Sequence, residues 1–517
     1  MKTKDCDRYI DRPFNIRPIC FWAFFVGLTV VVCGFANRAD AYWVIVIYFA
    51  MLVGGFFGLQ FVKSKDNVIT FLGTSRLFFC GTVVLCLVVV ASFALVTFSH
   101  TNQKSYAGYK ELGGVVEIYK TKDDGSGYFV ISSAKFGGSA IDGRVMVFAE
   151  SMEDSLAGGF NTFDKVCVIT QLRVAVVNDY YINNGIKYTA SIRAADVITV
   201  TGKDNGVRST VLGYSNDFLG RYLSEDNAEL MYSMLFGDKN SLDGEIRDSF
   251  ALTSLAHVLS VSGLHVGLII VMLMFVLNLL RVSRKKQLYV IFVVLLVYCY
   301  LCGFQYAILR ASIMFLVFAA RRAYARSTDM LSSLCLSAII ILILFPFSLY
   351  SVSFQLSFAC MFGIALFNLP FKNFFLRYVK SEWLATALSM YFATTIACLP
   401  FMIKYFGLVS VVGVLANIIV MPVIVIVFQA CVVSVVTWIA FPILYLMEPI
   451  LTFALAILKW MADLPIAVIK VSGGGGDWAL IFMLGLILMS RFIFAPKKYK
   501  YSAAAVMIAI YSLSVIL

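Results

Sequence analysis

Long apolar runs constrain this sequence more than any other feature. Three runs before residue 100 each approach the ~20 residues that an α-helix needs to cross a bilayer core; they lie near residues 20–36, 41–62 and 77–98. The chain is 61% hydrophobic and 14% charged, whereas soluble globular domains carry roughly 25% charged residues. The sequence therefore predicts a polytopic α-helical membrane protein, in which residues 1–99 hold the amino-terminal spans.

A larger group of apolar runs fills residues 250–517. They predict further spans near 250–280, 287–304, 306–320, 330–349, 351–369, 384–403, 408–440, 443–470, 478–495 and 501–517. The 408–440 run holds Pro422, so it is either one tilted span or two half-helices. Lys and Arg gather in alternate loops, and the positive-inside rule then places the amino terminus in the cytoplasm. The same rule makes the net charge of +12 weak evidence for a polyanionic partner.

Residues 100–223 have a different character. β-branched and aromatic runs alternate with turn signals such as Asn183-Asn184-Gly185, which predicts a small extracytoplasmic all-β domain, with an OB-like barrel as one candidate. Because Lys and Arg nearly balance Asp and Glu here, any contact with DNA would depend on aromatic stacking. The candidates are Tyr128, Phe129, Tyr180 and Tyr181, although core packing is the commoner role for a single aromatic residue. Residues 224–249 then read as an amphipathic connecting segment, with a surface helix at 227–236.

The stretch 256–267 combines histidines and serines with an apolar surrounding. His257, Ser260, Ser262, Gly263 and His265 lie here, and ionisable groups at membrane depth usually serve a function. Ser-x-Ser-Gly weakens a helix, so we expect a break at Ser262-Gly263 that directs a helix end toward a ligand. Two histidines without a carboxylate or third histidine nearby do not fill a zinc shell, so no metal is predicted, and no cofactor motif is visible.

Four further polar residues lie inside apolar runs. Arg310 is deep in its run, where an unsatisfied arginine costs about 3 kcal/mol, so we expect it to face a cavity suited to anionic cargo. Gln355, Ser357 and Asn417 are candidates for the same passage, although hydrogen bonding between helices explains each of them at least as well.

The ordered motifs resemble the ComEC family of competence membrane channels, which act in natural DNA uptake. Leu235-Phe236-Gly237-Asp238-Lys239 and the 256–266 stretch are similar to the opening signature of that family, and Arg310-Ala311-Ser312-Ile313-Met314 to its Arg-Ala-x-x-Met element. Phe354-Gln355-Leu356-Ser357-Phe358 and Asn417 follow in the family's order. Two positions depart from the pattern: Ser254 stands where a glycine is usual, and Tyr306-Ala307 stand where Pro-Ser is common.

The resemblance implies an inner-membrane channel that conducts single-stranded DNA into the cytoplasm, with residues 250–517 as the channel domain. It implies a DNA receptor and an ATPase as partners, and the lipid bilayer as surroundings. Many members also carry a metallo-β-lactamase-like domain, a suspected nuclease; with three histidines this chain is expected to lack it, so a separate nuclease would act. We therefore expect a transport channel rather than an enzyme. An intramembrane Ser/His hydrolase and a small-solute permease remain the alternatives.

Overall fold

The computed structural model describes residues 18–38, 44–48, 50–51, 76–106, 108–121, 126–150, 163–175, 179–192, 198–204, 206–238, 242–259, 261–324, 330–437, 443–465 and 467–470. Two amino-terminal helices, α2 (Pro18–Arg38) and α5 (Arg76–Thr101), cover the first and third predicted runs, and α5 holds a stretch long and apolar enough to cross a membrane. Most of the second predicted span lies outside the described residues.

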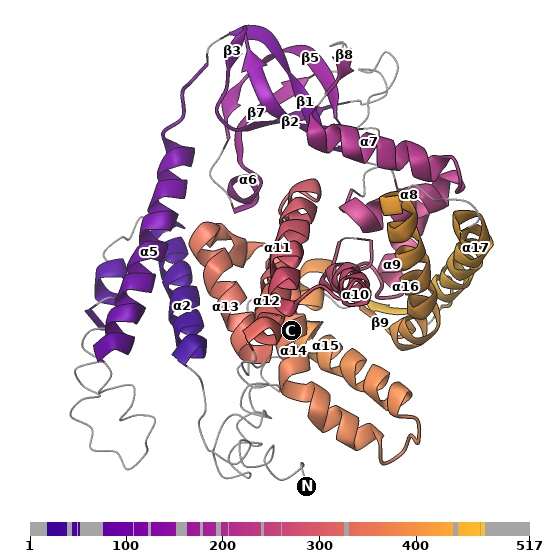
Figure 1. Cartoon of the computed structure of the whole chain (residues 1–517). Helices are drawn as coiled ribbons and strands as arrows, with labels where there is room; N and C mark the ends of the chain where they lie inside the picture. The colour runs from indigo at the N-terminus through magenta and orange to yellow at the C-terminus, as the bar shows by residue number, and fades with distance from the viewer. Residues whose placement is uncertain are drawn as a thin grey trace.

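The carboxy-terminal half is a helical bundle in the lower part of Figure 1. Its elements are α10 (Gly263–Leu279), α11 (Arg284–Leu301), α12 (Tyr306–Tyr324), α13 (Met330–Leu344), the 3-10 turn η1 (Pro346–Tyr350), α14 (Val352–Phe375), α15 (Glu382–Phe406), β9 (Leu408–Ser410), α16 (Gly413–Thr437), α17 (Ile443–Ala462) and β10 (Val468–Lys470). The amino-terminal helix α2 packs against α13, so distant parts of the sequence share one bundle.

The described residues contain five helices that are long and apolar enough to cross a membrane. They are Cys80–Thr101, Val352–Phe375, Glu382–Phe406, Gly413–Thr437 and Ile443–Ala462. Large apolar side chains are exposed on several bundle helices, for example Phe275 (69%) on α10 and Phe453 (68%) on α17, as expected where a helix faces lipid. The molecule is therefore a polytopic helical membrane protein.

Two predicted spans differ from the observed helices in an informative way. The 250–280 span is broken, because α10 begins only at Gly263. The 408–440 run contains one continuous helix, α16, with Pro422 inside it, so the alternative of two half-helices is wrong. The spans predicted at 478–495 and 501–517 lie outside the described residues.

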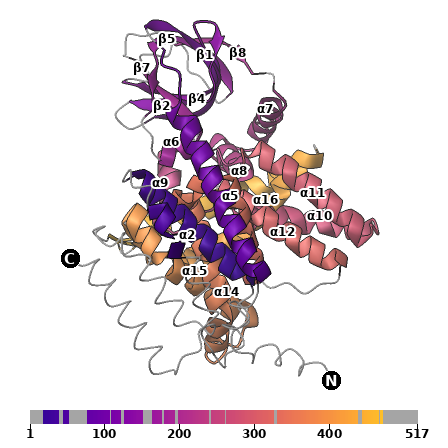
Figure 2. The same cartoon turned by 90° about the vertical axis from the view of Figure 1, so that its left-hand side faces the viewer.

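A small β domain stands above the bundle, at the end of α5 (Figures 1 and 2). Its strands are β1 (Tyr109–Thr121), β2 (Gly127–Phe136), β3 (Ser139–Ala140), β4 (Arg144–Ala149), β5 (Asp164–Gln171), β6 (Arg173–Val174), β7 (Ile186–Ile192) and β8 (Thr199–Lys203). These strands confirm the β-rich character that the sequence predicts for residues 100–223.

The strands pair in a single mixed sheet that curls toward a barrel. β1 pairs with both β2 and β5, β2 pairs with β4, and β4 runs parallel to β7. A hydrogen bond from Thr170 Oγ1 of β5 to the Ser191 carbonyl of β7, at 3.1 Å, joins the two ends of this series. Leu112, Phe129 and Val147 are fully buried between the strands, so alternating apolar side chains supply the core.

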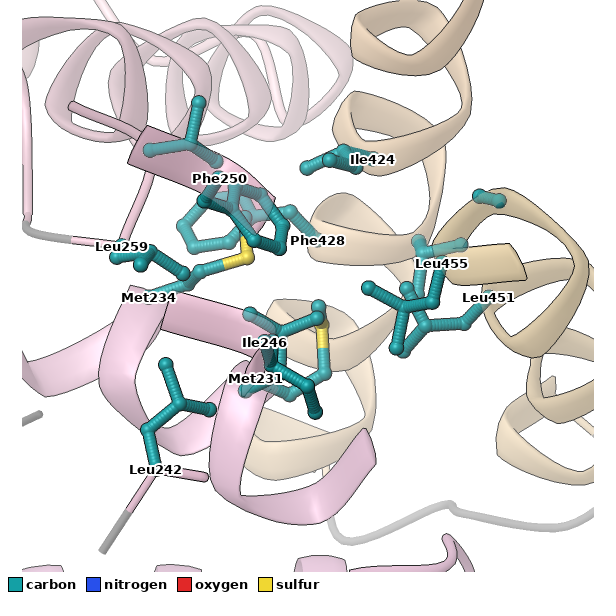
Figure 3. Packing of buried hydrophobic residues seen from close by; sticks show 14 of the residues in the cluster. Met231, Met234, Leu242, Ile246, Phe250, Leu259, Ile424, Phe428, Leu451 and Leu455 are labelled. Atoms are coloured by element: carbon teal, nitrogen blue, oxygen red, sulfur yellow. The ribbon is translucent and has the colours of Figure 1, made fainter. Parts of the chain in front are cut away.

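Four short helices connect the barrel to the bundle: α6 (Asp179–Asn183), α7 (Val207–Gly220), α8 (Glu225–Phe236) and α9 (Gly244–Leu252). The prediction of a surface helix at 227–236 is wrong, since nine of the twelve residues of α8 are buried. The buried side chains of α8 pack with α9, α16 and α17 in the largest apolar cluster of the described residues (Figure 3). This cluster includes Met231, Met234, Ile246, Phe250, Ile424, Phe428, Leu451 and Leu455. This core anchors the segment that leads into α10.

Candidate functional site

The loop before α10 interrupts the first apolar run of the bundle. Ser254 adopts a positive φ of 64°, a conformation that glycine tolerates best. Its Cβ lies 2.8 Å from the position that a Cβ on Gly413 would occupy, so it packs directly against the start of α16. His257 follows on the exposed side of this loop, with its Nδ1 atom 3.1 Å from the Ser254 carbonyl oxygen. Ser260 lies outside the described residues.

Ser262 and His265 form the cap of α10. The Ser262 backbone N–H donates to His265 Nδ1 at 3.1 Å, and the Leu264 N–H donates to Ser262 Oγ at 3.3 Å. This is a capping box in which a histidine takes the place usually held by Glu or Gln. Because Nδ1 accepts a backbone proton, the ring proton of a neutral His265 is on Nε2.

His265 is also a packing residue. Its ring is 1% exposed and lies 4.5 Å from the Phe428 ring of α16, centroid to centroid. Ser262 Oγ lies 3.4 Å from Nδ1, which already accepts the backbone N–H. This geometry is typical of a helix cap, and it gives the Ser/His pair a structural explanation in place of a nucleophile and its base.

Arg310 lies in the second turn of α12 and is directed at the start of α10. A Cβ on Gly263 would lie 2.9 Å from Arg310 Nη2 and 3.6 Å from Ala311 Cβ, so a larger residue at this position would displace the guanidinium. Arg310 is 5% exposed, and its Nε has no hydrogen-bond partner among the residues that the structure describes. The Phe358 ring of α14 lies 6.0 Å from Arg310 Cζ.

The electrostatics of this contact favour an anion. The amino-terminal end of a helix carries about half a positive charge from its aligned peptide dipoles. Arg310 adds a full positive charge at the same point, where burial makes an uncompensated cation costly. Helix amino termini bind phosphate readily, so the Gly263–Arg310 contact is suited to an anionic group. We call it the α10–α12 contact.

The other predicted passage residues form bonds between or within helices. Gln355 Nε2 donates to the Leu349 carbonyl at 2.9 Å, and Gln355 Oε1 accepts from the Tyr405 hydroxyl at 2.8 Å, which joins η1, α14 and α15. Asn417 Nδ2 donates to the Gly413 carbonyl at 2.8 Å, inside the first turn of α16. Ser357 is half-buried on α14.

The aromatic residues predicted to meet DNA in the β domain divide into two groups. Phe129 is fully buried in the barrel core, so it offers no ring face to a base, and its selection as a contact is corrected. Tyr128 packs beside Phe148, with ring centroids 6.3 Å apart, and Tyr180 packs beside Tyr181 at 6.0 Å. Tyr180 is 47% exposed and Phe148 is 39% exposed.

Several residues at this site were not selected from the sequence. Phe148 was missed because strand alternation placed it among ordinary core aromatics. Phe358 was part of a quoted motif, but nothing local in the sequence indicated that it faces Arg310. Gln305 packs against Gly237, the left-handed cap of α8 with φ 84°, so two motifs that are far apart in the sequence touch beside α12.

Comparisons with known proteins agree with these motifs. The profile of the Competence family, described as "Competence protein", matches residues 234–497. ComE operon protein 3 of Bacillus subtilis (strain 168) is 26% identical over 216 residues, which cover 42% of this chain and 26% of that protein. The match thus spans about a quarter of the length of this curated relative. No solved structure gives a significant match.

Proposed function

The chain belongs to the competence protein family, and on that premise we propose that it conducts single-stranded DNA across a membrane during DNA uptake. The supporting observation is the α10–α12 contact. It puts a buried cation with an unpartnered Nε among the described residues at the positive end of a broken helix. A strand of DNA carries one phosphate per nucleotide, and each phosphate fits this combination of charges.

The proposed route begins at the β domain and continues past α12. Tyr128, Phe148, Tyr180 and Tyr181 offer aromatic rings where bases would stack on arrival. The phosphates then pass the guanidinium of Arg310, with the Phe358 ring as a neighbouring apolar wall. Because Arg310 is 5% exposed, this passage is closed in the present arrangement and opens by a shift of α12 against α10.

The same proposal covers the location of the protein and its partners. We place the protein in the cytoplasmic membrane, with the β domain outside, because Lys and Arg gather in alternate loops of the sequence. A receptor would deliver DNA to the β domain, an ATPase would draw the strand inward, and a separate nuclease would remove the other strand. His257 is an exposed residue of the mostly buried loop before α10 and would meet the strand near the entrance.

The test replaces Arg310 with methionine and measures transformation frequency in the native host. We expect a loss of at least about a hundredfold, which is the effect of ~2.8 kcal/mol. The amount of protein in the membrane should not fall, because removing a buried charge without a compensating partner does not destabilise a fold.

The matched control is Arg321→Met, at the end of the same helix, where the side chain is exposed. It should leave transformation within about twofold of wild type, since exposed charges contribute little to a buried passage. Normal transformation by Arg310→Met would rule out the conduit. Equal losses in the two variants would show instead that any change of charge on α12 disturbs uptake.

A further inference from the structure

The β domain is joined to the helix that carries Arg310 by a polar link. Asn183, the last residue of α6, receives a hydrogen bond at Oδ1 from the Tyr306 hydroxyl, at 2.9 Å. Its Nδ2 donates to the Phe347 carbonyl of η1 at 3.0 Å. Tyr306 is the first residue of α12, so one amide from the β domain holds both the start of α12 and the turn before α14.

Apolar packing supports this link. Ile182, next to Asn183, is buried in a cluster with Cys33, Phe93 and Phe347. The Phe93 and Phe347 rings stack at 4.4 Å. The figures agree, since α6 extends from the barrel toward the bundle beside the top of α13 (Figure 1). The hydrogen bonds of Asn183 therefore lie next to an apolar contact between α2, α5, α6 and η1.

A second link joins the segment after the β domain to the end of α11, just before α12 begins. Arg208 of α7, directly after the barrel, donates from Nε to the Leu301 carbonyl at 3.0 Å. Its guanidinium also lies over the Phe163 ring, 5.3 Å from the centroid. Leu301 ends α11, and the tight turn that follows contains Gly303 and Phe304 at positive φ before α12 begins.

We infer that Asn183 and Arg208 are positioning residues that couple the β domain to α12 and thereby control the α10–α12 contact. The inference rests on the proposed function. Tyr306 lies four residues before Arg310, about one helical turn, so a tilt of the β domain transmitted through Asn183 shifts the guanidinium relative to Gly263. Arrival of DNA at the β domain would open the passage through these two links.

The hydrogen bond to Asn183 depends on the hydroxyl of Tyr306. In the pattern that the sequence resembles, the position of Tyr306 is commonly a proline, which has no hydroxyl to donate. The departure from the pattern thus coincides with the hydroxyl that bonds Asn183. Because a neutral hydrogen bond contributes only about 1 kcal/mol, the link is strong enough to bias α12 and weak enough to break during transport.

The first measurement is amide hydrogen exchange of the full chain in lipid nanodiscs, without DNA. Asn183→Ala should speed exchange in residues 306–312 and 261–266 by about tenfold, because the bond to the start of α12 and the bond to η1 are both lost. Tyr306→Phe should produce part of the same change, and the double variant should be no faster than Asn183→Ala. Asn184→Ala is the matched control, since among the described residues its Nδ2 bonds the Tyr180 carbonyl of the adjacent helix α6, at 2.8 Å.

The second measurement is transformation frequency. Asn183→Ala and Arg208→Lys, which keeps the charge but loses Nε, should each reduce it by about tenfold, while Asn184→Ala should not. Unchanged exchange in residues 306–312 would overturn the coupling, even if Arg310→Met abolishes uptake. Faster exchange with normal transformation would also overturn it. The proposed function would fail separately, through Arg310→Met alone.

Discussion

His265 and Arg310 are both ionisable residues buried in the helical bundle, and their surroundings differ. The His265 ring accepts a backbone N–H, caps α10 and packs on Phe428. Arg310 is nearly as buried, but its Nε has no partner among the described residues, and it lies against the positive end of the same helix. Burial alone therefore does not distinguish the two residues; the completeness of their hydrogen bonds does.

The largest expected effect concerns the stability that His265 provides. His265→Ala removes a cap and leaves a cavity beside Phe428, so we expect the free energy of unfolding to fall by about 3 kcal/mol. Gln is the usual residue at this position of a capping box, so His265→Gln should recover much of the stability and should support normal transformation. Denaturation in detergent and a transformation assay measure the two effects. A stable His265→Gln protein without uptake would give the imidazole a functional role and break the comparison.

Gly263→Ala tests whether the position of the Arg310 guanidinium matters for DNA uptake. The new Cβ would lie 2.9 Å from Nη2, and the flexible guanidinium can move away at little cost to the fold. We therefore expect nearly unchanged thermal stability but a decrease in transformation of about tenfold, equivalent to ~1.4 kcal/mol. Gly267→Ala, which would meet Phe315 instead, serves as the control on the same helix. Equal transformation by the two variants would count against the α10–α12 contact.

Glu229 adds a third ionisable group, outside the spans, whose environment opposes its charge. Burial, followed by the charges of Glu225, Asp226 and Asp243, raises its pKa to about 7. The folded state thus holds this proton at pH values where the unfolded chain, with a pKa of about 4.3, has lost it. Stability from Glu229 is present at low pH and is lost as the pH rises from about 4.5 to 7.

Glu229→Gln should remove this dependence. The variant should match wild type near pH 4.5 and be more stable by about 1 kcal/mol above pH 7, after allowance for screening by solvent. Thermal unfolding in detergent across this pH range measures the difference. A difference that does not vary with pH would show that Glu229 is not protonated in the fold.

The smallest expected effect tests the backbone of the loop before α10. Ser254→Gly relieves a positive φ that costs a non-glycine residue about 1–2 kcal/mol, but it also increases the freedom of the unfolded chain. We expect a net gain below about 1 kcal/mol and unchanged transformation. Thermal unfolding measures it, and a clear loss of stability would show that the packing of the Ser254 side chain on Gly413 outweighs the strain.

The sequence predicts the membrane class, the barrel and the break at Ser262-Gly263 because each depends on local patterns of apolar, β-branched and helix-breaking residues. It also selects Arg310, since charge inside an apolar run is visible without a structure. It cannot separate Arg310 from His265, because the Ser262 N–H becomes a partner of the imidazole only where a helix begins at Gly263, and Phe428 becomes one only when the fold brings α10 and α16 together.

The coupling residues illustrate the same limit. Asn183 lies in a turn signal of the β domain, and an Asn in a turn usually serves its own backbone. Its bonds to Tyr306 and Phe347 span 123 and 164 residues of sequence, which no local pattern can predict. The departure at Tyr306 from the family's proline was visible, but its meaning required the position of α6.

The most direct test of the conduit is photo-crosslinking from beside Arg310. A benzoyl-phenylalanine at Phe358, whose ring lies 6.0 Å from Arg310 Cζ, should form adducts with incoming DNA when cells are irradiated during uptake. The same group at the lipid-facing Phe453, which is 68% exposed, should form none. DNA that enters such cells normally without any adduct at residue 358 would contradict a passage beside the Arg310 guanidinium.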